Sequence, residues 1–130
     1  MTINSPEAFI ASLWNWQILA GCFGDSKISP TDVDGGVERR GWCLALETKL
    51  PGVEIKPAQM SFYKALVETG RFTVILIWGK PGRPEKIVVM TRFTTREYAI
   101  ADIKVLRQII TRWYEFANTT KMVPPKFGAS

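Results

Sequence analysis

The sequence predicts a mixed β-sheet covered by helices, in the α/β or α+β class. Three observations lead to this class. The apolar run FTVILIW at 72–78 is bounded by Gly and Pro, as is typical of a central strand buried on both faces. The stretch 31–49 has the pattern of a hairpin that turns at Arg40 and Gly41. Apolar residues recur at helical spacing in 5–19, 58–70 and 94–120.

The first element is expected to be a helix over 5–19. Ser5 can cap it, Pro6 suits the first helical position, and Glu7 suits the positive end of the helix dipole. Apolar residues then follow at helical spacing, namely Phe9, Leu13, Trp16 and Ala20. The following segment 21–31, GCFGDSKISPT, is rich in turn residues and predicts a loop.

The remaining elements follow the hairpin. PGVEIKP breaks the strand pattern, and AQMSFYKALVETG predicts a helix that ends at Gly70. After the strand 72–78, GKPGRP predicts a turn and 85–93 another strand. The stretch 94–120 predicts a long helix, with an apolar stripe formed by Ile100, Ile103, Leu106, Ile110 and Trp113. The expected order is therefore α, β-β, α, β, β, α.

Length and composition fit one globular domain, residues 1–130, with a loose tail from about 119 to 130. The chain is 46% apolar and 22% charged and can bury roughly two-thirds of its unfolded surface. We expect no membrane contact, because no apolar run approaches a span of about 18 residues. The N-terminus lacks the pattern of a signal peptide. Cys22 and Cys43 have no metal or disulfide-framework spacing, so reduced thiols in a cytoplasmic protein are expected.

Two features of the composition bear on function. The chain contains no histidine, which excludes Ser-His-Asp and Cys-His catalysis and His-ligated zinc. Hydrolysis would have to use carboxylates, lysines, hydroxyls or a metal bound through oxygen. The 17 Lys and Arg against 12 Asp and Glu leave a net charge of +5, which favours polyanionic partners such as nucleic acid.

The hairpin collects charged side chains on one face. With Arg40 and Gly41 as the turn, Asp34 is expected to oppose Glu47, and Asp32 to oppose Lys49. Because side chains alternate along a strand, these four would share one face. The other face would be apolar, with Val33, Val37, Leu44 and Leu46.

Two facing carboxylates repel each other unless a cation lies between them. Mg²⁺ binds one or two carboxylates and keeps positions for water and a substrate phosphate. Lys49 beside it can orient an attacking water or stabilise charge on a phosphate. The alternative is an ordinary cross-strand ion pair between Asp32 and Lys49 on a solvated face, worth less than about 1 kcal/mol.

TDVDGGVERRGWCLALETK followed by PAQMSFYKAL resembles the PD-(D/E)XK nuclease superfamily, over roughly residues 5–80. The resemblance implies a restriction-endonuclease-like αβββαβ core, here with an extra C-terminal strand and helix. It also implies Mg²⁺ or Mn²⁺ and hydrolysis of phosphodiester bonds. The family aspartate falls on Asp34, the E-x-K motif on Glu47 and Lys49, and the helix glutamine on Gln59. No proline directly precedes Asp34, so Asp32 stays an alternative ligand.

Further candidate residues surround this motif. The metal would be held by Asp34, Glu47 and the carbonyl of Thr48, with Glu7 and Glu38 as additional candidates. A helix-dipole role is the alternative for Glu7, and a solvated helix position is the alternative for Gln59. Cations expected to follow a DNA backbone are Arg39, Arg40, Lys56 and Lys64. Trp14, Trp16, Trp113 and Tyr114 are expected in the core or in subunit contacts.

The resulting hypothesis is a Mg²⁺- or Mn²⁺-dependent deoxyribonuclease. We expect an endonuclease, structure-specific or junction-resolving, that acts on DNA as a homodimer. The alternative from another class is a non-catalytic nucleic-acid-binding or protein-binding module that keeps the nuclease fold. An enzyme acting on a small acidic metabolite has little support, because GKPGRP is a turn and no phosphate-binding glycine loop occurs.

Overall fold

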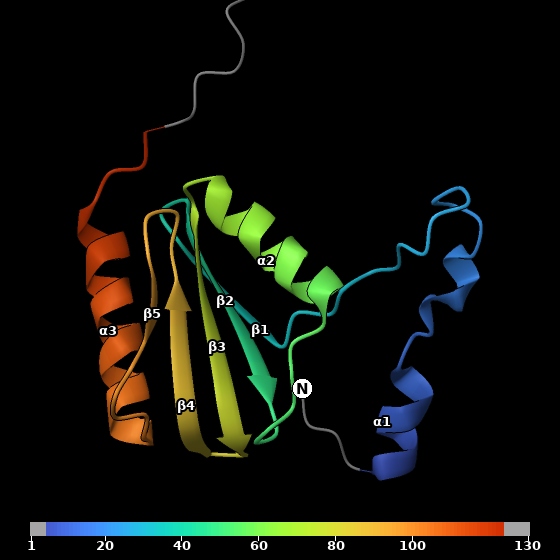
Figure 1. Ribbon diagram of the computed structural model, residues 1–130, viewed down its shortest axis with the longest axis horizontal. Helices are drawn as coiled ribbons and strands as arrows, with labels where there is room; N and C mark the ends of the chain where they lie inside the picture. Colours follow the sequence, from blue (N-terminus) through green and yellow to red (C-terminus); the bar gives the residue numbers. More distant parts are fainter. Residues whose placement is uncertain (1–4, 124–130) are drawn as a thin grey trace, which may run out of the picture. The chain divides into compact units, whose positions relative to one another are not determined.

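The structure, a computed structural model, describes residues 5–123 (Figure 1). It divides into two compact units, Met1–Thr31 and Asp32–Ser130. Of the predicted tail, residues 124–130 lie outside the described part. No helix within 5–123 combines the length and apolar character needed to cross a membrane.

The first unit contains two short helices in place of the predicted single helix over 5–19. The α-helix α1 spans Pro6–Ser12, and the 3₁₀-helix η1 spans Trp16–Leu19. The predicted cap is confirmed, because the Ser5 hydroxyl accepts a hydrogen bond from the Ala8 amide at 3.1 Å. The helix ends at Ser12, and the backbone of the following Leu13 is extended. Neither helix contains a buried residue, so neither has the packed apolar face that usually sustains a longer helix.

The second unit is built on a five-stranded mixed sheet with the order β1-β2-β3-β4-β5. Its strands are β1 Gly35–Arg39, β2 Trp42–Lys49, β3 Phe72–Lys80, β4 Arg83–Met90 and β5 Thr95–Glu97. β2 and β3 are parallel, and the other neighbours are antiparallel. The parallel pair is connected through helix α2, Pro57–Glu68. The predicted class, a mixed sheet with helices, is confirmed.

The β1–β2 hairpin has the predicted turn and register. Pairing runs from Gly35 opposite Leu46 to Arg39 opposite Trp42. Arg40 and Gly41 have φ of 55° and 89°, the left-handed conformations that a two-residue type I′ turn requires. β1 begins at Gly35, so Asp32 and Asp34 precede it, and their predicted opposition to Lys49 and Glu47 is not part of the sheet.

The sheet separates two apolar clusters, as its strand alternation requires. Toward α2 lie Ala45, Val74 and Leu76 with Tyr63 and Val67 of the helix. Toward α3, Ile103–Thr119, lie residues that include Leu44, Ile75, Ile87, Ile109 and Trp113. β3 contributes to both clusters, which confirms the prediction that 72–78 is a central strand buried on both faces.

The predicted helix over 94–120 starts later than expected. Thr95–Glu97 forms β5, with Val89 opposite Arg96, and this pairing with β4 prevents a helix there. α3 begins after Asp102, whose carboxylate accepts from the Val105 amide at 2.8 Å. The buried stripe is therefore Ile109, Trp113 and Ala117, while the predicted stripe members Ile100 and Ile103 are exposed.

Candidate functional site

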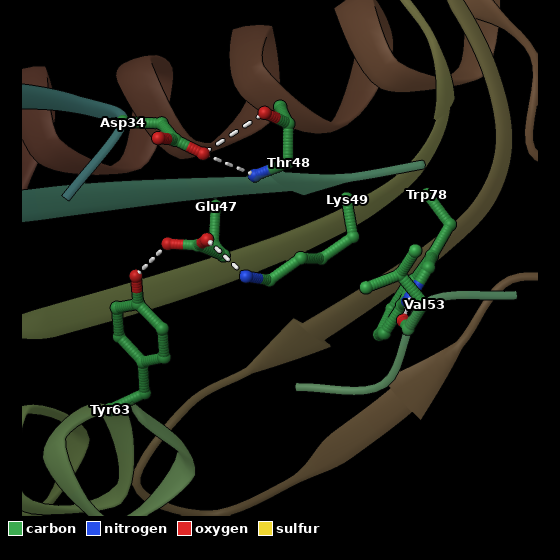
Figure 2. A network of polar contacts seen from close by, with 7 residues as sticks. All are labelled: Asp34, Glu47, Thr48, Lys49, Val53, Tyr63 and Trp78. Carbon is green, nitrogen blue, oxygen red and sulfur yellow. Dashed lines mark hydrogen bonds and ion pairs between the residues drawn. The ribbon is translucent and has the colours of Figure 1, made fainter. Parts of the chain in front are cut away.

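A buried carboxylate lies between β2 and α2. Glu47 is only 3% exposed and is the one charged residue among the buried residues of 5–123. Its Oε2 accepts a hydrogen bond from the Tyr63 hydroxyl, and its Oε1 lies 3.4 Å from the Lys49 ammonium (Figure 2). Both carboxylate oxygens therefore have a partner, which offsets the cost of removing the charge from water.

The local sequence explains this placement. Alternation along β2 directs Ala45, Glu47 and Lys49 to the α2 face, and Ala45 packs in the same cluster as Tyr63. Burial raises the pKa of Tyr63, and its hydrogen bond to Glu47 and the negative charges of Glu47 and Asp34 raise this pKa further. The Tyr63 hydroxyl thus keeps its proton and acts as the donor. Sequence reasoning missed Tyr63, although it lies four residues after Gln59 on the same helix.

Asp34 is held at β2 by a different residue. Its Oδ2 accepts from the Thr48 amide at 2.8 Å and from the Thr48 hydroxyl at 2.9 Å. In Figure 2, Asp34 and Thr48 lie on one side of the β2 ribbon, and Glu47 and Lys49 lie on the other. The prediction that Asp34 and Glu47 share a face is therefore wrong. Strand alternation does not govern Asp34, because it precedes β1 and its carboxylate caps Thr48 instead.

Asp34 and Glu47 carry the oxygen donors that a hard cation prefers, but the two carboxylates do not converge on one point. Carboxylates from Asp34 and Glu47 flank one strand, and their charges both act on the Tyr63 hydroxyl. Within residues 5–123, however, no three acidic, Cys or His side chains are grouped to hold a metal ion. For both carboxylates to bind one ion, Asp34 would have to turn away from Thr48.

Gln59 is partly buried on α2, one helical turn before Tyr63. Its Oε1 is buried and has no hydrogen-bond partner among the described residues. A buried amide oxygen without a partner is costly, so this atom is available to a donor from a ligand or water. This environment differs from the solvated helix position considered as the alternative.

The other predicted acidic candidates lie elsewhere. Glu38 is opposite Cys43, near the turn, and its carboxylate accepts from the Gly41 amide at 2.8 Å. It therefore caps the turn, about 13 Å along β2 from Glu47, and is not a neighbour of the buried carboxylate. Asp32 is exposed ahead of β1. Glu7 lies in the first turn of α1, in the first unit.

A row of basic and aromatic side chains crosses the sheet beside Glu47. Lys49 of β2 is paired with Trp78 of β3, and Trp78 is paired with Lys86 of β4. The Lys86 ammonium lies 4.7 Å from the centre of the Trp78 ring. The indole N–H donates to the Val53 carbonyl at 2.6 Å, which ties the 50–56 segment to the sheet (Figure 2). Two cations thus flank an oriented aromatic ring next to the buried carboxylate.

Of the cations expected along a DNA backbone, Arg39 and Arg40 lie at the hairpin turn, away from Glu47. Arg39 donates to the Asn118 side chain of α3 at 2.8 Å, and Arg40 is in the hairpin turn. Lys56 and Lys64 are exposed, at the start and along α2. Among the four aromatic residues expected in the core or in subunit contacts, Trp113 lies in the core, whereas Trp14, Trp16 and Tyr114 are exposed.

No protein-family model matches the chain, and neither the curated proteins nor the solved structures contain a significant match. The functional conclusion therefore depends on the residues themselves.

Proposed function

We propose that the protein is a divalent-metal-dependent deoxyribonuclease of the endonuclease type. The observation that carries the proposal is the buried Glu47 carboxylate, which lies between the Tyr63 hydroxyl and the Lys49 ammonium. A charged group inside an otherwise apolar cluster costs stability unless it is paired, and such groups concentrate at functional sites. Glu47 and Lys49 form the E-x-K motif on one strand, and Asp34 lies in the neighbouring segment. These residue types are the ones that metal-dependent phosphodiester hydrolysis needs.

Each residue has a role in this proposal. Glu47 and the Thr48 carbonyl would supply oxygen donors for Mg²⁺ or Mn²⁺, and Asp34 would join them once its carboxylate turns away from Thr48. Such an ion, when bound, lowers the pKa of water and neutralises charge on a phosphate. Tyr63 holds Glu47 in one orientation, and Lys49 orients the water and stabilises the developing charge. Gln59 Oε1, which lacks a partner among the described residues, accepts a hydrogen bond from that water.

Electrostatics and the cross-sheet row support a nucleic-acid substrate. The chain carries a net charge of +5, and Lys49, Trp78 and Lys86 form a continuous row across three strands. Two cations with one aromatic ring between them suit a phosphate backbone and a base that stacks on the ring. A restriction-endonuclease-like core, a homodimer and a junction or another branched substrate belong to the same proposal.

The test is metal-dependent cleavage. Supercoiled plasmid and branched DNA are incubated with the full chain in Mg²⁺, Mn²⁺ or EDTA, and products are resolved by electrophoresis. We expect nicking or cleavage only with metal, and a loss of about 100-fold or more in Glu47→Gln and Lys49→Ala. Circular dichroism should show a retained fold in both variants. Glu47→Gln should keep most of the DNA affinity, whereas Lys49→Ala should also lose some stability and affinity, because it removes a partner of the buried carboxylate and one cation of the row.

Matched controls are Glu115→Gln and Lys104→Ala. Glu115 and Lys104 are both exposed on α3, away from β2 and the row from Lys49 to Lys86, so both variants should cleave normally. A fully active Lys49→Ala protein would overturn the proposed mechanism.

A second candidate is a non-catalytic binding module that keeps the same fold. The contact of Asp34 with Thr48, on the other side of β2 from Glu47, favours it. In that case Glu47, Lys49 and Tyr63 form a structural network. DNA binding in every metal condition without any cleavage product would select this candidate.

A further inference from the structure

A hollow separate from the candidate site lies on the α3 face of the sheet. It measures about 590 Å³ and is bounded by the start of β2 and β3, the end of β4 and the second half of α3. We call it the arginine-rimmed hollow. Its aromatic wall includes Trp42, Tyr98, Trp113 and Phe116, and its cations are Arg71, Arg92 and Arg112. Its size is typical of a binding pocket.

The wall is apolar and ordered by its own contacts. The Trp42 ring meets the Phe116 ring edge-on, with centroids 4.8 Å apart. The Trp42 indole N–H is already used, because it donates to the Thr120 carbonyl at 2.9 Å. Trp113 belongs to the core cluster on this face. The wall therefore offers apolar surface and few free polar groups, which suits an aliphatic or aromatic side chain.

The cations around this wall have no acidic partner in the described part of the chain. Within residues 5–123, Arg71, Arg92 and Arg112 form no ion pair. Arg92 lies over the ring of Phe93, 5.7 Å from its centre, and Phe93 is 85% exposed. Three guanidinium groups around an apolar hollow create a positive rim that complements carboxylates, which arginine binds through paired hydrogen bonds.

We propose that the arginine-rimmed hollow is a docking site for an acidic peptide segment of a partner protein. An apolar anchor side chain of that segment enters the hollow, and flanking Asp or Glu residues pair with the arginines. The arginines alone would bind either carboxylates or phosphates, but the aromatic wall favours a peptide, because it takes an apolar side chain and would leave the polar edge of a base unpaired. The hollow also lies on the face opposite Glu47, about 16 Å away along β2, so it is independent of the proposed nuclease site.

The experiment selects peptides from a defined library. A displayed library of random dodecapeptides is panned against the full chain, and enriched sequences are synthesised with a fluorescent label for binding by fluorescence anisotropy. We expect enriched peptides with one Trp, Phe or Leu flanked by two or more Asp or Glu. Replacing that anchor by Ser should abolish measurable binding.

Variants of exposed arginines localise the site. Arg92→Glu and Arg112→Glu should each weaken peptide binding by about tenfold or more, because both remove a cation and add a repelling charge. Arg107→Glu is the matched control. It makes the same change of net charge on an exposed residue of α3 that does not line the hollow, so it should bind within about twofold of the unchanged chain.

Three results would overturn the proposal. Selection could fail to enrich any motif or could enrich neutral or basic peptides. Peptide binding could weaken equally in Arg107→Glu and Arg112→Glu, which would indicate a general charge effect. Labelled oligo-dT could bind with the same dependence on Arg92 and Arg112, which would make this face a nucleic-acid surface. None of these measurements uses DNA cleavage. The docking proposal can therefore fail or succeed independently of the nuclease proposal.

Discussion

The Glu47 carboxylate shows how one buried charge depends on its partners. The Tyr63 hydroxyl and the Lys49 ammonium each engage one of its oxygens. Lys49 is partly accessible at its side chain, whereas Tyr63 is fully buried. Water therefore cannot replace the hydrogen bond from the Tyr63 hydroxyl. Removing that hydroxyl should lower the stability of the protein as well as any activity.

Tyr63→Phe should destabilise the protein by about 1–3 kcal/mol, because it leaves a buried carboxylate oxygen without its donor. Urea unfolding followed by circular dichroism measures the change. Tyr114→Phe is the control: Tyr114 is exposed on α3, and the loss of its hydroxyl should change stability by about 0.5 kcal/mol or less. Equal effects of the two substitutions would contradict the role of the Tyr63–Glu47 bond.

The raised pKa of Tyr63 predicts a loss of stability at alkaline pH. In the unfolded chain a tyrosine loses its proton near pH 10, whereas Tyr63 keeps its proton in the folded state. Above about pH 10 the unfolded state therefore binds fewer protons, and the free energy of unfolding falls as pH rises. The stability difference between the unchanged chain and Tyr63→Phe should stay constant up to about pH 9.5 and shrink as the pH rises from about 10 to 11. A difference that stays constant from about pH 10 to 11 would show that Tyr63 titrates normally when folded.

At the scale of elements, the local sequence predicted the β1–β2 hairpin correctly but not the boundaries of β5 and α3. Arg40 and Gly41 set both turn and register, and the observed pairs agree with them. β5 was missed because TRE carries no strand signal of its own, and only its pairing with β4 makes it extended. The predicted stripe is confirmed for Leu106, Ile110 and Trp113, which lie in or against the α3-side cluster. It is wrong for Ile100, which precedes α3, and for Ile103 in its first turn, because both are exposed.

The β3–β4 hairpin depends on one glycine. A Cβ at Gly79 would overlap the Arg83 carbonyl oxygen and approach the Pro84 Cα to 2.9 Å, at an irregularity in the pairing. Gly79→Ala should destabilise by about 2 kcal/mol or more, because the backbone must move. Gly36→Ala is the control, since nothing lies closer than 4.0 Å, and it should be neutral or stabilise by up to about 1 kcal/mol. Thermal unfolding of both variants checks the contrast.

At the scale of the whole molecule, the two faces of the sheet serve different proposed purposes. The α2 face carries the buried carboxylate and the row from Lys49 to Lys86. The α3 face carries the arginine-rimmed hollow. Both apolar clusters consist entirely of residues from the unit Asp32–Ser130.

A fragment of residues 32–130 should therefore fold without the first unit. We expect cooperative urea unfolding with a midpoint close to that of the full chain, since both clusters are retained. The far-ultraviolet circular dichroism spectrum should show the mixed sheet and helices. A fragment that unfolds without cooperativity would mean that residues 1–31 contribute to the core.

The sequence by itself determined the mixed class, the central strand 72–78, the hairpin turn and the position of Glu47 and Lys49 on one face of β2. These follow from short-range rules of alternation, turn conformation and apolar runs. Only the tertiary structure decided that Tyr63 pairs with Glu47, that Asp34 is held by Thr48 and that arginines surround an apolar hollow. Each of these arrangements joins residues that are distant in the chain or includes a residue outside the strands. The periodicity of the sequence carries no information about such partners.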